Sequence, residues 1–210
     1  MTRMERLFAL SHGAPGSVLL LLAIVVASVI ALLAGQALIE RCVFRPYWLV
    51  PRREYWTLVS SGFVHADVAH LLFNAITFWA FAFALERRVG TASLLWLYAI
   101  GLLASDAGTW LKHRREPEYR TLGASGAILA LLFASIVYFP TNSIFILPIP
   151  VPIPAPVFAV AYLAYTYYAS NRSGSRINHD AHLYGALAGL AFVALTDPEA
   201  LRRAWQHVAG

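Results

Sequence analysis

Residues 121–140 read TLGASGAILALLFASIVYFP, an apolar run in which Ser125 lies between two nearby glycines. Residues 121–171 contain no charged side chain, and a second uncharged run, residues 186–196, follows His182. Polar groups just inside segments of hydrocarbon length are costly. A serine and a histidine are also the minimum set for an activated hydroxyl nucleophile. The two runs therefore favour hydrolysis inside a membrane as the first hypothesis.

The composition is that of a polytopic membrane protein. Of the 210 residues, 59% are hydrophobic and 13% are charged, whereas a soluble domain has about 25% charged residues. The net charge of +5 comes from short basic groups between apolar runs. That distribution is typical of membrane-flanking loops and argues against a nucleic-acid-binding face. Because Cys42 is the only cysteine, no intrachain disulfide is possible.

About 20 apolar residues are needed to cross the hydrocarbon core as a helix. By this measure we expect six spans, at residues 17–39, 68–86, 91–111, 122–139, 156–170 and 181–196. Residues 1–16 would form an N-terminal tail. Residues 40–67 are amphipathic and too long for a hairpin, so we expect a loop in the membrane interface. Residues 197–210 would form a short amphipathic helix capped by Asp197.

Proline occupies every second position from Pro148 to Pro156, just before the fifth expected span. Proline lacks the N–H that a helix needs and disfavours helix in the preceding residue. This segment should therefore be extended or polyproline-like. It is either an ordinary connecting loop or a hinge for a moving fifth helix.

Four polar groups would converge if six spans alternate in direction. The second, fourth and sixth spans would then enter the membrane from one side, bringing together His70, Asn74, Ser125 and His182. Each has a structural alternative: serine can bond a backbone carbonyl or pack as a small residue, His182 can be a satisfied buried histidine, and His70 with Asn74 can form a helix–helix hydrogen bond.

Small residues favour the functional interpretation. Gly185 and Gly189 share a helical face with His182, and such a seam permits close helix contact. A matching seam on the fourth span consists of Gly126, Ala130 and Ala134. Ser125 would lie near a helix N-terminus, where free N–H groups and the helix dipole favour an oxyanion. Zinc is disfavoured, because no HExxH or cysteine-based ligand pattern occurs. Asp180, near His179, is interpreted as loop polarity.

Taken in order, these motifs resemble those of the rhomboid intramembrane serine proteases over residues 17–196. The resemblance rests on the GxSG of Gly123 to Gly126, His65 followed by the HxxxN of His70 to Asn74, ERRVG at residues 86–90, and AHLYG at residues 181–185 with Gly189. A lone GxSG is weak evidence, but the ordered set on the expected spans is specific.

The resemblance implies an all-α polytopic membrane protein with a six-transmembrane-helix rhomboid-like bundle. It implies a Ser125–His182 dyad without a carboxylate, and an oxyanion hole formed by the Ser125 N–H with His70 and Asn74. Residues that support the site would be Gly123, Gly126, His65, Gly185 and Gly189. No metal or other cofactor is expected. The substrates would be transmembrane proteins, cleaved in or near their membrane segments, and the fifth helix would be a lateral gate.

Two positions depart from the family pattern. Thr57 follows Trp56 where many members have arginine, and Leu129 stands where many have an aromatic residue stacked on the catalytic histidine. The family also places the site on the non-cytoplasmic side, whereas a plain count of Lys and Arg favours the opposite; we expect the family topology. A bacterial inner membrane is the expected location. Alternatives are a non-catalytic relative that binds membrane clients and a small transporter.

Overall fold

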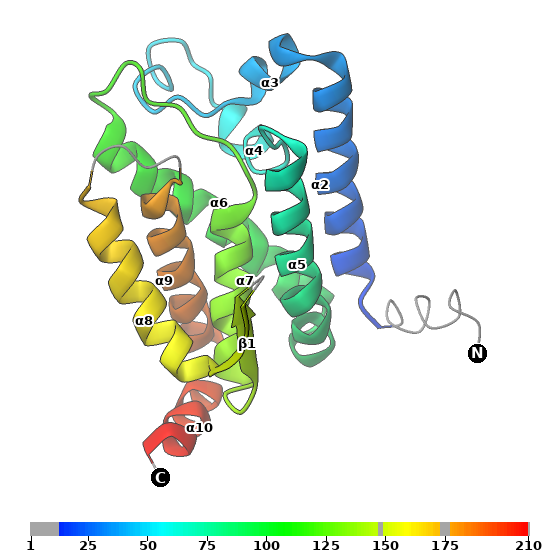
Figure 1. The fold of residues 1–210 in the computed structure, drawn as a ribbon, viewed down its shortest axis with the longest axis vertical. Helices are drawn as coiled ribbons and strands as arrows, with labels where there is room; N and C mark the ends of the chain where they lie inside the picture. The colour runs from blue at the N-terminus through cyan, green and yellow to red at the C-terminus, as the bar shows by residue number, and fades with distance from the viewer. Residues whose placement is uncertain (1–12, 147–148, 173–176, 210) are drawn as a thin grey trace.

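Helix α7 (Ser125–Tyr138) lies at the centre of the molecule, because it is apolar on every face. In the computed structural model, which describes residues 13–146, 149–172 and 177–209, every residue from Gly126 to Val137 is buried. Three long helices pack around α7: α5 (Val68–Val89), α6 (Thr91–His113) and α9 (His179–Thr196). Helix α2 (Pro15–Ala34) lies outside against α5 and α6, and α8 (Ala155–Ser170) lies outside against α9 (Figure 1).

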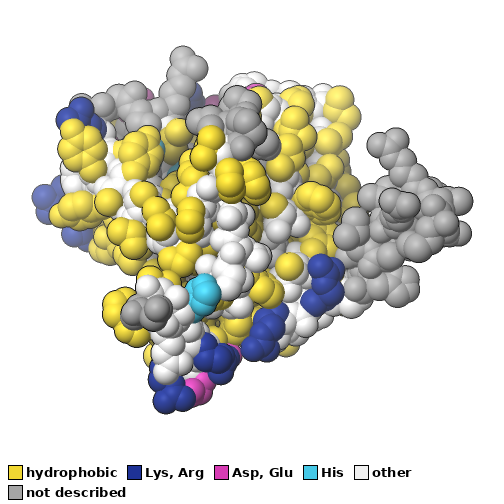
Figure 2. Space-filling model, turned by 60° about the horizontal axis from the view of Figure 1, so that its bottom comes forward, with side chains coloured by type: hydrophobic (Ala, Val, Ile, Leu, Met, Phe, Trp, Pro, Cys, Tyr) yellow, Lys and Arg dark blue, Asp and Glu magenta, His cyan; other side chains and the backbone are white. Residues whose placement is uncertain are grey.

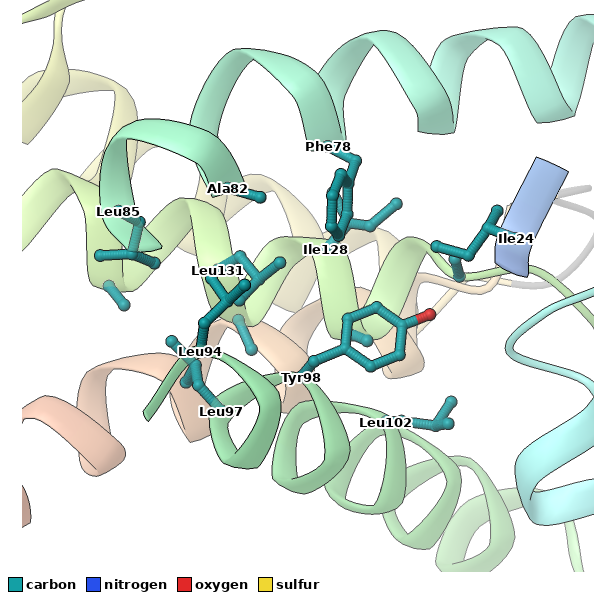
Figure 3. Packing of buried hydrophobic residues seen from close by; sticks show 14 of the residues in the cluster. Ile24, Phe78, Ala82, Leu85, Leu94, Leu97, Tyr98, Leu102, Ile128 and Leu131 are labelled. Carbon is teal, nitrogen blue, oxygen red and sulfur yellow. The ribbon is translucent and has the colours of Figure 1, made fainter. Parts of the chain in front are cut away.

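The main core lies between α5, α6 and α7. Phe78 and Leu85 of α5 and Leu94 of α6 are fully buried there, together with Ile128 and Leu131 of α7 (Figure 3). Close packing of these side chains fixes where α7 begins relative to its neighbours. The start of α7 is the part of the fold on which the site depends.

The outer surface of the bundle is apolar. Helices α2, α5 and α6 are long and apolar enough to cross a membrane, and α7 is a shorter apolar helix. Leu33 and Trp96 on these helices are exposed. Hydrophobic side chains cover much of the face seen in Figure 2, and Lys and Arg side chains lie along its lower edge and at its left edge. An apolar belt with basic residues at its edge is typical of a membrane helix bundle. Six spans remain a prediction.

The first expected span, about residues 17–39, extends past the end of the helix that the structure contains. Helix α2 begins at Pro15, inside the expected tail 1–16, of which residues 1–12 lie outside the described part of the chain. The helix ends at Ala34 because Gly35 has a φ of 89°, a left-handed conformation that terminates helices. A separate short helix, α3 (Gln36–Cys42), follows. The sequence is apolar on both sides of Gly35, so its pattern did not predict that the helix ends there.

The connection after α3 is tied to the segment that precedes α7. Phe44 and Thr121 exchange two backbone hydrogen bonds of 2.9 and 3.0 Å. Farther along, the one-turn helix α4 (Thr57–Ser60) packs on α6. The Trp48 indole also donates to the Pro117 carbonyl at 3.2 Å. This connection therefore holds the segment that leads to Ser125 in place. Its location in a membrane interface stays a prediction.

The proline-rich segment is extended, as expected, but it is also paired. Strands β1 (Ser143–Ile146) and β2 (Ile149–Pro154) form an antiparallel hairpin that opposes Ile144 to Ile153; Pro148 lies outside the described residues. Proline is tolerated because both strands of a two-stranded sheet are edge strands. After α9, Asp197 caps α10 (Pro198–Ala209) by accepting from the Ala200 N–H at 3.1 Å, which confirms the predicted start of that helix.

Candidate active site

The nucleophile candidate, Ser125, is the first residue of α7, and it follows a turn at Gly123. Gly123 has a φ of 124° and donates its N–H to the Ser61 carbonyl at 2.8 Å. A Cβ at Gly123 would lie 2.6 Å from Cε1 of His70. Only glycine fits both the backbone conformation and the space. As the first helical residue, Ser125 also has one of the N–H groups that an α-helix leaves without an intrahelical partner.

The base candidate, His182, lies in the first turn of α9. The Asn178 side chain caps this helix by accepting from the Ala181 N–H at 3.0 Å. The same side chain donates to Thr109 Oγ1 at 3.0 Å and Thr121 Oγ1 at 3.2 Å. One asparagine thus joins α9 to α6 and to the segment before Ser125.

Small residues bring α9 against α7. A Cβ added at Gly185 would collide with the Gly126 carbonyl oxygen, and one at Gly189 would collide with the Ala130 carbonyl oxygen. The backbones therefore touch along the predicted seam. This close approach determines the depth at which His182 faces Ser125.

The two side chains meet. His182 Nε2 lies 2.9 Å from Ser125 Oγ, and both residues are half-buried. This distance is within the range required for proton transfer from a nucleophile to its base. Their catalytic roles remain a prediction, and the geometry permits them.

Tyr162 is a member of the site that the sequence interpretation missed. Its hydroxyl lies 3.0 Å from His182 Nδ1, the ring nitrogen that does not face Ser125. The Tyr162 ring stacks on Phe158 at 5.3 Å between centroids and packs against Phe133 at 5.9 Å. The available signal was weak: Phe158, Tyr162 and Thr166 recur every four residues, which marks one face of α8 but no function.

Of the two predicted oxyanion residues, His70 lies beside the turn that precedes Ser125, and Asn74 follows one turn later on α5. His70 is placed by Asp67, which caps α5 and accepts from the His70 N–H at 2.8 Å. Its ring lies over Gly123, as the glycine contact above requires. Asn74 is buried, and its side-chain amide donates to the His70 carbonyl at 2.9 Å. In this structure the Asn74 amide therefore bonds within its own helix.

His65 is a fully buried support for the nucleophile turn. Ser28 Oγ lies 2.8 Å from its Nδ1, and the Ala124 N–H points at its Nε2 at 3.4 Å. Because the Ser28 hydroxyl donates to the Phe63 carbonyl, the ring proton belongs on Nδ1. Burial lowers the pKa of His65 to about 3, so the ring stays neutral and can accept from Ala124. His65 thus connects α2 to the residue before Ser125.

The interpretation of Asp180 as loop polarity is wrong. Asp180 is buried in the first turn of α9, where its carboxylate bonds Lys112 Nζ at 2.9 Å and His113 Nε2 at 2.9 Å. Lys112 also donates to the Ser170 carbonyl at the end of α8, and His113 stacks on Tyr119 at 3.6 Å. The partners lie 67 and 68 residues away in sequence, which is why spacing did not reveal them. Asp180 joins α6, α8 and α9 rather than contacting the His182 ring.

Within residues 13–146, 149–172 and 177–209, no three His, Cys, Asp or Glu side chains are placed to hold a metal ion. Around Ser125 the described residues offer a hydroxyl, an imidazole and a phenol.

Comparison with known proteins identifies the family. Residues 52–198 match the family model of the Rhomboid domain. The chain is 33% identical to YdcA of Bacillus subtilis over 71% of this chain and 72% of YdcA. It is 30% identical to the rhomboid protease GluP of Bacillus subtilis, over 72% of this chain and 28% of GluP. It is 24% identical to the rhomboid protease GlpG of Salmonella paratyphi A, over 91% of this chain and 67% of GlpG. The chain belongs to the rhomboid family and, with its apolar helices, is an integral membrane protein.

Proposed function

We propose that this protein is an intramembrane serine endopeptidase that cleaves transmembrane segments of other membrane proteins. The observation that carries the proposal is the 2.9 Å contact between Ser125 Oγ and His182 Nε2 at the start of the central helix. The names of GluP and GlpG, both rhomboid proteases, support the same activity.

In the proposed reaction, Ser125 Oγ attacks the carbonyl carbon of the scissile peptide while His182 Nε2 takes the hydroxyl proton. The negative charge on the carbonyl oxygen is stabilised by the Ser125 N–H, the His70 ring and the Asn74 amide. His182 then gives the proton to the leaving amine, which breaks the C–N bond. A water molecule hydrolyses the acyl-enzyme, with His182 again acting as base, and restores Ser125.

Asn74 can join this donor set while it keeps its present hydrogen bond. Its amide nitrogen carries two protons, and one of them bonds the His70 carbonyl. The second proton is the one assigned to the oxyanion. Catalytic hydrogen bonds often tighten only when substrate is bound.

We further propose that six helices, α2, α5, α6, α7, α8 and α9, span a bacterial inner membrane. The alternation of their directions supports this, because α5, α7 and α9 each begin near the site. Transmembrane proteins are the proposed partners, and lipid surrounds the apolar belt.

The test is cleavage of a transmembrane reporter by the protein reconstituted in vesicles. Ser125→Ala should lower the rate by at least about a thousandfold while the helical circular dichroism spectrum is unchanged. The matched control is Ser135→Ala, which removes another buried hydroxyl from α7 and should leave cleavage near the wild-type rate. Equal cleavage by the Ser125 variant would remove the nucleophile assignment. A folded wild-type protein that binds reporters without cleaving them would favour the client-binding alternative.

A further inference from the structure

We propose that Tyr162 is a positioning residue that holds the His182 ring from α8, so that the serine–histidine pair is competent only while α8 is docked against α9. This inference rests on the proposed function and adds a third side chain to its site. It begins from the 3.0 Å distance between the Tyr162 hydroxyl and His182 Nδ1.

The direction of this hydrogen bond follows from the chemistry at the other ring nitrogen. To take a proton from Ser125, Nε2 must be unprotonated, so the neutral ring carries its proton on Nδ1. The Nδ1–H then donates to the Tyr162 oxygen. If Tyr162 donated instead, the ring proton would lie on Nε2, facing Ser125, and the ring could not act as base. A Tyr162 oxygen that accepts from Nδ1–H is therefore compatible with the tautomer that the reaction needs.

The phenol is itself held firmly. Phe158 stacks on it with an interplanar angle of 23°, and Phe133 of α7 packs against it. The Tyr162 and His182 rings are also inclined by 23°, with centroids 6.5 Å apart. Leu129, four residues after Ser125, is buried among Phe133 and Phe158 in the same cluster and offers no hydrogen bond. In the described part of the chain, the polar contacts of the His182 ring are those to Ser125 and Tyr162.

The helix that carries Tyr162 packs on the bundle through a narrow face and is tied to α6 by Lys112 at its last residue. Only Ala155, Phe158 and Thr166 are buried among the residues of α8, and the helix lies at the edge of the bundle beside α9 (Figure 1). Regions with few buried contacts open at low free-energy cost. Movement of α8 away from α9 would withdraw the acceptor from Nδ1. The state of α8 is thereby coupled to the orientation of the base.

The experiment compares the wild-type protein with Tyr162→Phe, which keeps the aromatic ring and removes the hydroxyl. Loss of one hydrogen bond to the base should lower kcat about tenfold, with KM unchanged within about twofold. The ¹⁵N spectrum of the His182 ring, assigned with a His182→Gln variant, should show the Nδ1 signal shifted. The matched control is Tyr165→Phe on the same helix, whose ring packs edge-on against His179 and should change neither readout.

An unchanged His182 ring spectrum in Tyr162→Phe overturns the proposal whatever the activity, and so does an unchanged kcat. If the variant does not fold, the wild-type spectrum decides: the proposal requires the proton on Nδ1, and a ring protonated on Nε2 contradicts it. The spectrum needs no turnover. Failure of the proposed function would show separately, as absence of reporter cleavage by wild-type protein with an intact Nδ1 hydrogen bond.

Discussion

The two contacts that α9 makes, with α7 and with α8, are built in opposite ways. On the side that faces α7, Gly185 and Gly189 have no side chains, so their backbones lie directly on α7. Against α8, aromatic side chains bridge the gap, with Tyr162 reaching His182. A backbone contact has no rotamers and little freedom to shift, whereas a side-chain contact on a weakly buried helix can open. The contact between α9 and α7 thus determines the distance between Ser125 and His182. The contact between α9 and α8 determines the orientation of the His182 ring.

The largest expected effect comes from breaking the rigid contact. Gly185→Val would place side-chain atoms where the Gly126 carbonyl lies, so α9 must move outward. Overpacking of this kind should lower the free energy of unfolding by roughly 3 kcal/mol and abolish reporter cleavage. Denaturant titration followed by circular dichroism measures the first effect. Leu187→Val, on the exposed side of the same helix, should change stability by less than about 0.5 kcal/mol. Equal stability of Gly185→Val and wild type would show that α9 and α7 are not in close backbone contact at Gly185.

A middle-sized effect is expected where α6, α8 and α9 meet. Asp180→Asn leaves Lys112 and His113 without their carboxylate. Breaking a buried pair costs about 3 kcal/mol or more, but Lys112 is partly solvated, so we expect roughly 1–2 kcal/mol in the same titration.

The control for Asp180 is Glu116→Gln, which removes the exposed partner of the same histidine and should cost at most about 0.5 kcal/mol. Similar losses from the two variants would contradict a structural role for the buried carboxylate. Reporter cleavage by Asp180→Asn should fall less than in the Gly185 variant, because the seam is intact.

The smallest expected effect comes from loosening α8 alone. Phe158→Leu removes the ring stacked on Tyr162 while keeping an apolar side chain. We expect kcat to fall about threefold, which corresponds to less than 1 kcal/mol, with little change in global stability. Val160→Ala, on the exposed face of the same helix, should leave kcat unchanged. A Phe158 variant with wild-type kcat would mean that the packing around Tyr162 does not affect the orientation of the His182 ring.

Much of this arrangement was predictable from local patterns. The expected apolar segments correspond to α2, α5, α6, α7, α8 and α9, and the small residues at Gly126 and Gly185 predicted the helix contact that the structure contains. The alternation of spans predicted that Ser125 and His182 lie on the same side of the membrane, and the resemblance to rhomboid proteases implied their pairing. These features depend on periodicity and residue size, which a sequence displays directly.

The errors and omissions concern features that local patterns do not determine. The break at Gly35 depends on the backbone conformation of one glycine inside an apolar run. The β1–β2 hairpin depends on strand pairing, which the alternating prolines gave no reason to expect. The Asp180 ion pairs join residues far apart in sequence. Tyr162 resembled any aromatic residue of a membrane helix, because its role depends on which face of α8 docks against α9.

The proposed activity depends on Ser125 being a nucleophile activated by His182. The most direct measurement is the site of reaction with a fluorophosphonate, determined by intact mass and peptide mapping of the reconstituted protein. We expect one adduct per chain, on Ser125, and none in a folded His182→Ala variant. An adduct on a different residue, or labelling of Ser125 at the wild-type rate without the imidazole, would contradict it.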